Sequence, residues 1–240
     1  MHLKRIILQP ANYPTNDQYP FNLELFRVTD SIEFTKPVVF FVGENGSGKS
    51  TLLRAIATKC GIHIWEGMER TRAHYNRYEK DLHKYISAEW VDKPVPGSFF
   101  ASEIFRNFAV NLDEWASMSP ATLEYFGGKS LLEQSHGQCH MSFFKNRFQI
   151  KGLYLLDEPE NALSPKRQIE LLQLLDQMGR LGHAQFIIAT HSPILLALQG
   201  SEIFSFDRAP IHTIDYEDTD HYRIYKSFIN DRKSMFEGLK

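Results

Sequence analysis

The sequence of 240 residues has little of several features that mark special classes of protein. Its only cysteines are Cys60 and Cys139, which excludes a disulfide framework and favours a reducing compartment. No apolar run approaches the roughly 18 residues of a membrane span, and the first residues lack the pattern of a secretory signal peptide. The 27 basic and 29 acidic residues nearly balance, so no overall positive charge favours a polyanionic partner. We therefore expect a soluble, cytoplasmic protein.

The composition is that of an ordinary globular protein. Hydrophobic residues make up 42% of the chain and charged residues 23%, close to the averages of about 45–50% and about 25%. At roughly 150 residues per domain, the length predicts one large domain over residues 1–240 that carries a sizeable insertion.

Apolar runs alternate with helical segments along most of the chain. The runs that predict buried strands are residues 38–42, 153–156, 185–189 and 203–206. One helix is predicted at residues 51–58, and another begins after Ser164 as N-cap with Pro165 at its first position. This order predicts an α/β fold with a parallel sheet and its chemistry at the carboxyl ends of the strands. Residues 3–8 and 23–34 are expected to form a small antiparallel edge sheet.

Residues 65–125 have a different pattern, which predicts an inserted helical subdomain. Apolar residues recur there at helical spacing in two groups, namely Tyr75, Tyr78, Leu82, Tyr85 and Ile86, and then Ile104, Phe105, Phe108, Leu112 and Trp115. Residues 207–240 are expected to be a C-terminal extension, in which the acidic segment 215–220 is a solvated turn that leads into a terminal helix.

The strongest functional signal is a glycine-rich loop between the strand at 38–42 and the helix that follows it. Residues 43–50 fit the pattern G-x-x-x-x-G-K-[ST]. With Thr51 included, the loop residues are Gly43, Glu44, Asn45, Gly46, Ser47, Gly48, Lys49, Ser50 and Thr51. Glycines let backbone N–H groups curl around a phosphate, and the helix directs its positive end at the same anion. We expect Lys49 to neutralise the β- and γ-phosphates of ATP and Ser50 to hold Mg²⁺.

Two acidic residues follow the strand at 153–156. Asp157 is placed to hold Mg²⁺ through water, and Glu158 is placed to polarise the attacking water as a general base. One carboxylate would suffice for binding alone, so the pair predicts hydrolysis as well as binding.

These motifs resemble those of the ABC-type ATPases, which include the nucleotide-binding subunits of transporters and the chromosome-associated SMC/RecF-type enzymes. The resemblance extends from about residue 3 to residue 206. Ser-His-Gly-Gln at 135–138 is similar to the family's signature segment, which is normally Ser-Gly-Gly-Gln. Asn-Ala-Leu-Ser at 161–164 is similar to the D-loop, and His191 is similar to the switch histidine.

The resemblance implies a P-loop NTPase fold and a site that two subunits share. In this family His191 would stabilise the γ-phosphate, while Ser135 and the backbone of Gly137 would contact the γ-phosphate bound to the other subunit. Gln138 belongs to the same nucleotide-binding segment. The expected assembly is a head-to-tail homodimer that two ATP molecules hold together and that hydrolysis releases.

The sequence also departs from the family pattern. His136 stands where the signature has its first glycine, and Ser164 where the D-loop usually has aspartate. No glutamine lies between Gln18 and Gln134, so the Q-loop residue that senses Mg²⁺ and couples to a transporter's membrane domain is missing. Glu103 is the candidate substitute, although a glutamate near a helix start is as readily a surface residue. The missing glutamine argues against transporters. The whole pattern, including residues 134–137 and 157–165, most resembles small stand-alone bacterial ATPases that are related to the SMC/RecF type but lack coiled-coil arms.

Three classes of function remain open. The first is a stand-alone ATPase that acts on DNA or on a protein partner in genome maintenance or defence. The second is the ATP-binding subunit of an ABC transporter, which requires a membrane partner. The third is an ATP-sensing scaffold that hydrolyses slowly or not at all, since His136 and Ser164 both lie at the predicted dimer interface. Fold analogy alone does not choose among them.

Three further patterns each allow two interpretations. One helix face could present His136, Cys139 and His140 to Zn²⁺, but a fourth ligand is missing. An aromatic ring that stacks on adenine could come from Tyr13, Tyr19 or Phe26, each of which could equally be a packing residue. A basic and aromatic segment contains Arg70, Arg72, Tyr75, Arg77, Tyr78 and Lys80. It suits a nucleic-acid surface, but interspersed acids favour the solvated face of an amphipathic helix.

Overall fold

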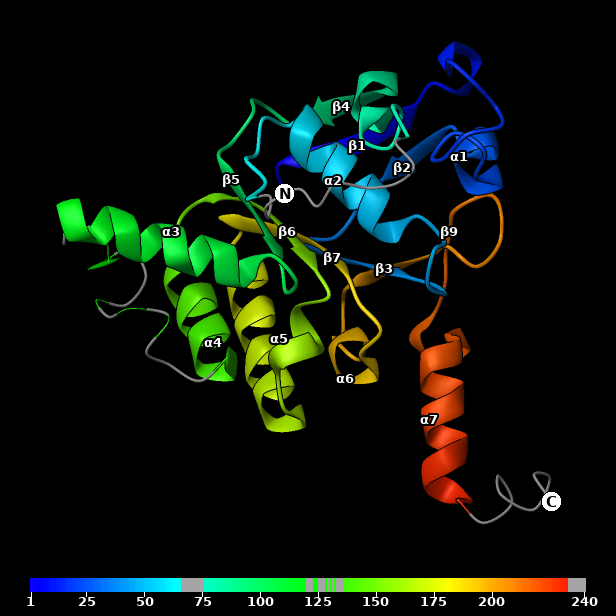
Figure 1. Cartoon of the computed structure of the whole chain (residues 1–240). Helices are drawn as coiled ribbons and strands as arrows, with labels where there is room; N and C mark the ends of the chain where they lie inside the picture. The colour runs from blue at the N-terminus through cyan, green and yellow to red at the C-terminus, as the bar shows by residue number, and fades with distance from the viewer. Residues whose placement is uncertain are drawn as a thin grey trace.

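Strands without a single exposed residue form the centre of a six-stranded sheet (Figure 1). The computed structural model describes residues 1–65, 76–119, 123–124, 128, 130, 132 and 136–232. The strands follow the order β5 (Gly97–Ala101), β6 (Gly152–Asp157), β7 (Ala184–Ala189), β3 (Val38–Val42), β8 (Glu202–Ser205) and β9 (His212–Thr213). The first five are parallel, and β9 is antiparallel to β8. Every residue of β3, β6 and β7 is buried, because the sheet is covered on both faces.

A second, three-stranded antiparallel sheet lies above one end of the first. In it, β1 (Leu3–Leu8) pairs with β2 (Ser31–Glu33) on one side and with β4 (Ile86–Trp90) on the other. Gln185 of β7 joins the two sheets, since its buried Oε1 accepts hydrogen bonds from the backbone N–H groups of His2 and Leu3, both at 2.7 Å. Its Nε2 donates to the carbonyl of Leu3 at 2.9 Å.

Alternate residues of β3 face two separate apolar layers. Val39 and Phe41 pack with α2 (Lys49–Lys59) and the antiparallel sheet, whereas Val38, Phe40 and Val42 face the opposite layer of helices. The helices of that opposite layer are α3 (Phe105–Met118), α4 (His136–Arg147), α5 (Pro165–Arg180) and α6 (Pro193–Leu196). This layering fixes α2 on one face of the sheet and α5 on the other (Figure 1).

The remaining described elements are short or lie at the margins. They are α1 (Glu24–Val28), α7 (Asp220–Asn230) and the 3-10 turns η1 (Pro10–Asn12), η2 (Asp81–Tyr85), η4 (Pro159–Ala162) and η5 (Tyr216–Asp218). α7 begins near α6 and extends away from the sheets (Figure 1). Across the described ranges, none of the helices combines the length and the apolar character needed to cross a bilayer.

The α/β fold class, the parallel core sheet and the small antiparallel sheet are confirmed. All four predicted strands and both predicted helices of the core are present, with boundaries that differ by at most two residues. The edge sheet forms from residues 3–8 and 31–33, but residues 24–28 within the expected strand region are helix α1. The terminal helix after the acidic turn is α7.

The expectation of an all-helical insertion over residues 65–125 is wrong for part of its length. Residues 86–90 form β4 and residues 97–101 form β5, which pair with β1 and β6 respectively. Where the helical spacing predicted a helix up to Tyr85 and Ile86, the structure has only the short 3-10 helix η2, and β4 follows it directly. Pairing with distant strands overrides local spacing here. The second group, from 104 to 115, does form a helix, α3, whereas Tyr75 lies outside the described residues.

We predict that Gln185→Leu destabilises the protein without changing its apolar packing. The substitution leaves two buried N–H groups and one carbonyl without partners, which should cost about 2–4 kcal/mol. Urea denaturation followed by circular dichroism measures the loss. Gln173→Leu, on the exposed surface of α5, is the matched control and should change stability little. An equal loss in both variants would contradict the role of Gln185 as the link between the sheets.

Candidate active site

The carboxyl ends of three neighbouring strands bring the predicted motifs together. The glycine loop follows β3, Asp157 is the last residue of β6 with Glu158 directly after it, and His191 follows β7. In the sheet β7 lies between β6 and β3, so all three motifs meet at one edge. This is the edge at which open parallel sheets bind their ligands.

The glycine loop depends on a backbone conformation that side chains disfavour. Gly48 has a φ of +102° and is the N-cap of α2. A Cβ at this position would lie 2.8 Å from Cζ of Phe26 and 3.0 Å from Cδ1 of Leu23. The loop therefore packs directly on Phe26 of α1 and on Leu23, which precedes α1. Only glycine fits at position 48. The positive end of α2 therefore begins directly at the glycine loop, as an anion site at a helix N-terminus requires.

Lys49 is almost completely buried beneath the loop, at 5% exposure. Its Nζ donates hydrogen bonds to the backbone carbonyls of Gly43 at 2.6 Å and Glu44 at 2.8 Å. Burial lowers the pKa of Lys49, while the nearby carboxylates of Asp207 and Glu158 oppose that shift. Carbonyls of the glycine loop thus hold the Lys49 ammonium group in the loop that would also bind a phosphate.

Ser50 and Asp157 meet across the gap between α2 and β6. The hydroxyl of Ser50 donates a hydrogen bond to Oδ1 of Asp157 at 2.8 Å. Burial raises the pKa of Asp157, whereas the bond from Ser50 and the charge of Arg54 lower it. A hydroxyl and a carboxylate are oxygen ligands of the kind that Mg²⁺ prefers, together with substrate phosphates. The two residues therefore fit the predicted metal.

Glu103 lies in the turn after β5 and pairs with Arg54 at 2.7 Å. The same Arg54 group lies 4.0 Å from Oδ2 of Asp157, so one guanidinium links both carboxylates. The Glu103 side chain is 73% exposed. Its predicted part in metal binding stays a prediction.

Glu158 and His191 face each other at the end of β6 and β7. Glu158 has a φ of +48°, and it alone among the described non-glycine residues has a positive φ. Its backbone N–H donates to the carbonyl of Ala189 at 2.9 Å, and its Oε2 accepts from Nδ2 of Asn161 at 2.6 Å. Nε2 of His191 lies 3.8 Å from Oε1 of Glu158. Strained backbone of this kind collects at functional sites.

Three residues that the sequence analysis did not assign to the site support Glu158 and His191. Ser102 donates its hydroxyl hydrogen to the carbonyl of Glu158 at 2.7 Å. Oε1 of Glu160 accepts the backbone N–H of His191 at 2.7 Å, and burial raises the pKa of that carboxyl. His221 of α7 lies against His191, with His221 Nε2 2.9 Å from His191 Nδ1. Glu160 could have been found from its place beside Glu158, but no pattern in the sequence connects His221 with His191.

The signature segment lies beside the D-loop-like segment. Ser135 and the side chain of His136 lie outside the described residues. Gly137 and Gln138 belong to the first turn of α4, where a Cβ on Gly137 would lie 3.0 Å from the carbonyl of Ala162. The close packing of α4 on η4 therefore favours glycine at 137.

The alternative zinc site draws on the same helix. Cys139 and His140 are both buried, and the ring of His140 packs edge-on against Phe100 and Phe105 at centroid distances of 5.0 and 4.5 Å. In the described part of the chain, no group of three or more histidine, cysteine, aspartate or glutamate side chains is arranged to hold a metal ion. A metal at Ser50 and Asp157 would accordingly need phosphate or water oxygens as further ligands.

The three adenine-stacking candidates occupy different environments. The Tyr13 ring packs on Phe21 and its hydroxyl donates to the carbonyl of Phe26 at 2.9 Å, while Phe26 itself is fully buried. Tyr19 is half-buried and its hydroxyl is hydrogen-bonded to Thr51 of the loop. Two of the three therefore lie against the glycine loop: Phe26 packs beneath Gly48 from the core, and half-buried Tyr19 contacts Thr51 through its hydroxyl.

The basic and aromatic segment is described only in part, because Arg70, Arg72 and Tyr75 lie outside the described residues. Arg77 stacks on the ring of Tyr78, with its guanidinium carbon 4.5 Å from the ring centroid. Lys80 directly precedes the 3-10 turn η2, so this part of the segment is not the amphipathic helix that the spacing predicted.

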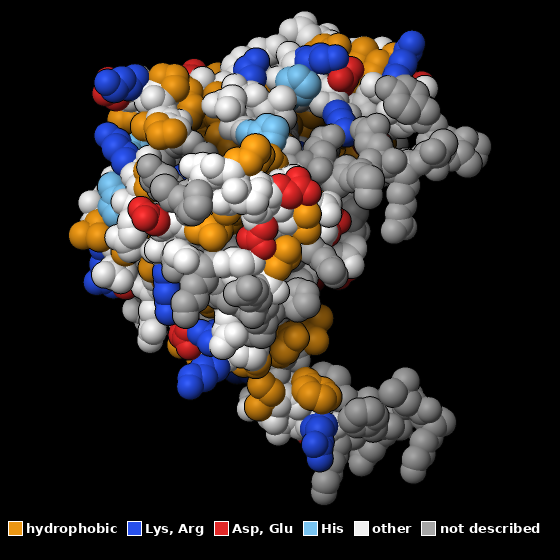
Figure 2. Space-filling view, turned by 60° about the vertical axis from the view of Figure 1, so that its left-hand side comes forward, with side chains coloured by type: hydrophobic (Ala, Val, Ile, Leu, Met, Phe, Trp, Pro, Cys, Tyr) orange, Lys and Arg blue, Asp and Glu red, His pale blue; other side chains and the backbone are white. Residues whose placement is uncertain are grey.

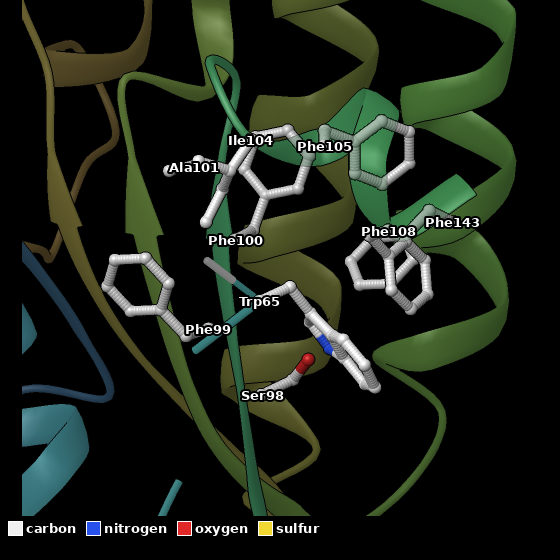
Figure 3. A pocket seen from close by; sticks show the side chains of 9 residues that line it. All are labelled: Trp65, Ser98, Phe99, Phe100, Ala101, Ile104, Phe105, Phe108 and Phe143. Atoms are coloured by element: carbon white, nitrogen blue, oxygen red, sulfur yellow. The ribbon is translucent and has the colours of Figure 1, made fainter. Parts of the chain in front are cut away.

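A small apolar cavity of about 20 Å³ lies between β5 and helices α3 and α4 (Figure 3). Its lining residues are Trp65, Ser98, Phe99, Phe100, Ala101, Ile104, Phe105, Phe108 and Phe143. The rings of Phe105, Phe108 and Phe143 cluster on its helix side, and no charged side chain lines it. A space that holds about one water molecule is too small for a nucleotide, so the glycine loop remains the candidate phosphate site.

Two protein-family models match parts of this chain. The model described as "AAA domain" matches residues 22–77, which contain the glycine loop. The model described as "AAA domain, putative AbiEii toxin, Type IV TA system" matches residues 130–197, which contain Asp157, Glu158 and His191. The two matches therefore cover the segments that meet at the candidate site.

Similar proteins include ATP-binding components of import systems. The thiamine import ATP-binding protein ThiQ of Haemophilus ducreyi is 30% identical over 172 residues, which cover 64% of this chain and 76% of that protein. The protein of the same name from Vibrio parahaemolyticus is 25% identical over 193 residues, which cover 72% and 77%. The solved structure of cbiO1 from Clostridium perfringens, part of the ABC transporter complex cbiONQ, matches with a TM-score of 0.53 at 17% identity. That match covers 100% of this chain and 99% of the other, and it bears on the fold alone.

We predict that Gly48→Ala weakens ATP binding. The new Cβ would meet Phe26 at 2.8 Å in a left-handed backbone conformation, a strain of about 1–3 kcal/mol. Isothermal titration should show a Kd for ATP that is about 10-fold higher or more. Gly200→Ala is the matched control, because Gly200 has a φ of +78° with nothing near its added Cβ. If both variants bind ATP with the same affinity, the packing of the loop on α1 does not control binding.

Proposed function

The chain belongs to the ABC-type P-loop ATPases, and from this premise we propose that it is an ATP-driven switch whose two subunits close on ATP and separate after hydrolysis. The observation that carries the proposal is the convergence of Lys49, the Ser50–Asp157 pair and the Glu158–His191 pair at one sheet edge. Phosphate binding, metal binding and water activation each have a candidate group there.

The phosphate-binding half of the reaction is assigned to the loop. The backbone N–H groups of residues 43–51 and the ammonium of Lys49 bind the β- and γ-phosphates. Ser50 and Asp157 would hold Mg²⁺, which when bound neutralises charge on those phosphate oxygens. The carbonyls of Gly43 and Glu44 keep Lys49 directed at the loop, so little rearrangement is needed when ATP binds.

The hydrolytic half is assigned to Glu158 and His191. Glu158 accepts a proton from the attacking water, whose oxygen bonds to the γ-phosphorus while the bond from that phosphorus to the β–γ bridging oxygen breaks. ADP then leaves with the bridging oxygen, and inorganic phosphate forms. Nε2 of His191, which faces Glu158, stabilises the charge on the γ-phosphate. Asn161 and Ser102 hold Glu158 in place for this step.

We assign the second half of each site to a partner copy bound head to tail. Ser135, Gly137 and Gln138 would contact the ATP of the other subunit, as the resemblance to the ABC family implies. The packing of α4 on η4 couples that segment to the residues that follow Glu158. When residues 135–138 of one subunit contact the ATP bound to its partner, this packing would transmit the contact to Glu158 in the same subunit as residues 135–138.

The physiological task that we favour is a stand-alone cytoplasmic ATPase acting on DNA or on a partner protein in genome maintenance or defence. The description of one matching family model, which names a type IV toxin–antitoxin system, supports a role in defence. The missing Q-loop glutamine argues against coupling to a membrane domain, and the low cysteine content supports a cytoplasmic location.

The second candidate is the ATP-binding subunit of a transporter, which the names of the relatives favour. ATP hydrolysis with and without double-stranded DNA separates the two, together with purification from membranes and from the supernatant. Stimulation by DNA supports the first candidate. Recovery in a membrane complex supports the second, and tight binding of ATP without turnover in any fraction supports a scaffold.

We predict that Glu158→Gln loses hydrolysis but keeps ATP binding. Loss of a general base should lower kcat by about 10²–10⁴-fold, while the loop and Lys49 still hold the nucleotide. A phosphate-release assay measures turnover, and sedimentation velocity at saturating ATP and Mg²⁺ should show a dimer. Glu114→Gln, on the exposed face of α3, is the matched control and should retain full activity. A monomeric Glu158→Gln protein under these conditions would overturn the shared-site assembly.

We predict that Asp157→Asn makes the reaction respond more weakly to Mg²⁺. Asparagine keeps an oxygen for the bond from Ser50 but removes the charge that favours the metal. The Mg²⁺ concentration for half-maximal hydrolysis should rise by about 10-fold or more. Glu103→Gln, measured in parallel, tests the competing acid. If Glu103→Gln shifts the Mg²⁺ response and Asp157→Asn does not, the metal role belongs to Glu103.

A further inference from the structure

The first turn of α7 returns the C-terminal part of the chain to the active site. Thr219, the N-cap of α7, is buried and its hydroxyl accepts the backbone N–H of Tyr222. His221 in this turn is half-buried, whereas residues 223–230 of the same helix are exposed. The helix is therefore anchored at the end that carries His221.

His221 is hydrogen-bonded to His191, the residue proposed to stabilise the γ-phosphate. Nε2 of His221 lies 2.9 Å from Nδ1 of His191, and the two ring centroids are 5.1 Å apart. A bond between two imidazole nitrogens needs a proton on one of them and a lone pair on the other. The direction of this bond therefore decides which nitrogen of His191 carries its proton.

The surroundings of both rings favour their neutral forms. Burial lowers the pKa of His191, and the charge of Lys49 lowers it further, against the opposing carboxylates of Glu158 and Glu44. Burial also lowers the pKa of His221, against the opposing Asp207 and Asp220. Each ring then carries one proton, so His191 is either an Nε2–H or an Nδ1–H tautomer.

The surroundings of His191 select between these tautomers. Its Nε2 faces Oε1 of Glu158 at 3.8 Å and has no hydrogen-bond partner among the described residues. A lone pair on Nε2 would face a carboxylate oxygen, whereas an N–H there is attracted to it. Nε2 of His191 thus carries the proton, Nδ1 accepts, and His221 is the donor.

We propose that His221 is a positioning residue of this ATPase: its Nε2–H donates to Nδ1 of His191 and holds the His191 ring with its Nε2–H directed at the γ-phosphate position. The proposal rests on the proposed role of His191 in hydrolysis. Glu160 fixes the backbone of His191 and His221 fixes its ring, so two groups from different elements define one orientation. Outer partners of this kind set both the tautomer and the plane of a functional histidine.

Three variants test this role by kinetics. His221→Phe keeps a ring but removes the donor, and it should lower kcat by about 10- to 100-fold while the KM for ATP stays nearly constant. His221→Gln places an amide N–H near the lost nitrogen and should restore most of kcat. His212→Phe changes an exposed histidine of β9 and is the matched control with unchanged kinetics. Equal loss in the Phe and Gln variants would overturn the donor role.

The tautomer itself is read by long-range ¹H–¹⁵N spectra of histidine-labelled protein. In the unsubstituted protein His191 should show a protonated Nε2 and an Nδ1 that accepts a hydrogen bond. The Nδ1 signal should lose that shift in His221→Phe and keep it in His221→Gln. A proton on Nδ1 of His191 in the unsubstituted protein would overturn the proposal, even if the Phe variant failed to fold.

His191→Ala separates failure of this inference from failure of the proposed function. Unchanged kcat in His191→Ala would remove His191 from the reaction, whatever the spectra show. A low kcat in His191→Ala combined with an unchanged kcat and unchanged spectrum in His221→Phe would retain the proposed function and reject the role of His221.

Discussion

The hydrogen-bonded register of three neighbouring parallel strands determines where each candidate catalytic group lies. Ala189, the last residue of β7, pairs with Phe41 of β3 on one side and with Asp157 of β6 on the other. The glycine loop starts two positions after Phe41, Glu158 directly follows Asp157, and His191 lies two positions after Ala189. A slip of one residue in either pairing would turn the side chains of that strand to the opposite face. The buried, mostly apolar faces of β3, β6 and β7 prevent such a slip because both layers of the core would be disrupted.

Within this frame each charged group of the site already has a partner inside the protein. Carbonyls of the loop hold Lys49, the hydroxyl of Ser50 holds Asp157, and Arg54 joins Asp157 to Glu103. Burying an unpaired charge would cost far more than such a site could tolerate. In the proposed reaction, contacts between protein groups would therefore be exchanged for contacts with phosphate and metal, rather than being created from unpaired groups. Nε2 of His191 is different, since it has no hydrogen-bond partner in the described part of the chain and faces Glu158, the proposed general base.

The sequence predicts the core and the phosphate loop well because both have local signals. Strands buried on two faces are continuous apolar runs, and the loop is a fixed pattern of glycines before a helix. β4 and β5 have no such signal. Their residues become strands through pairing with β1 and β6, whose paired residues lie 56 to 87 positions away in the chain. The role of Gln185 could not be predicted from the sequence for the same reason. It links the two sheets through hydrogen bonds to backbone groups more than 180 positions away.

His221 is the clearest case of a site residue that only the folded chain reveals. The resemblance to the ABC family ends near residue 206, so no motif of the family includes it. Beyond its anchored first turn, α7 has exposed apolar side chains, and Figure 2 shows hydrophobic groups along the part that extends below the body. These are Ile224, Tyr225, Phe228 and Ile229. A helix with so little of its length packed against the core depends on its first turn for its position. The hydrogen bond between His221 and His191 therefore joins the residue proposed to stabilise the γ-phosphate to a helix with little support from the core. The orientation of His191 then depends on whether the first turn of α7 stays in place.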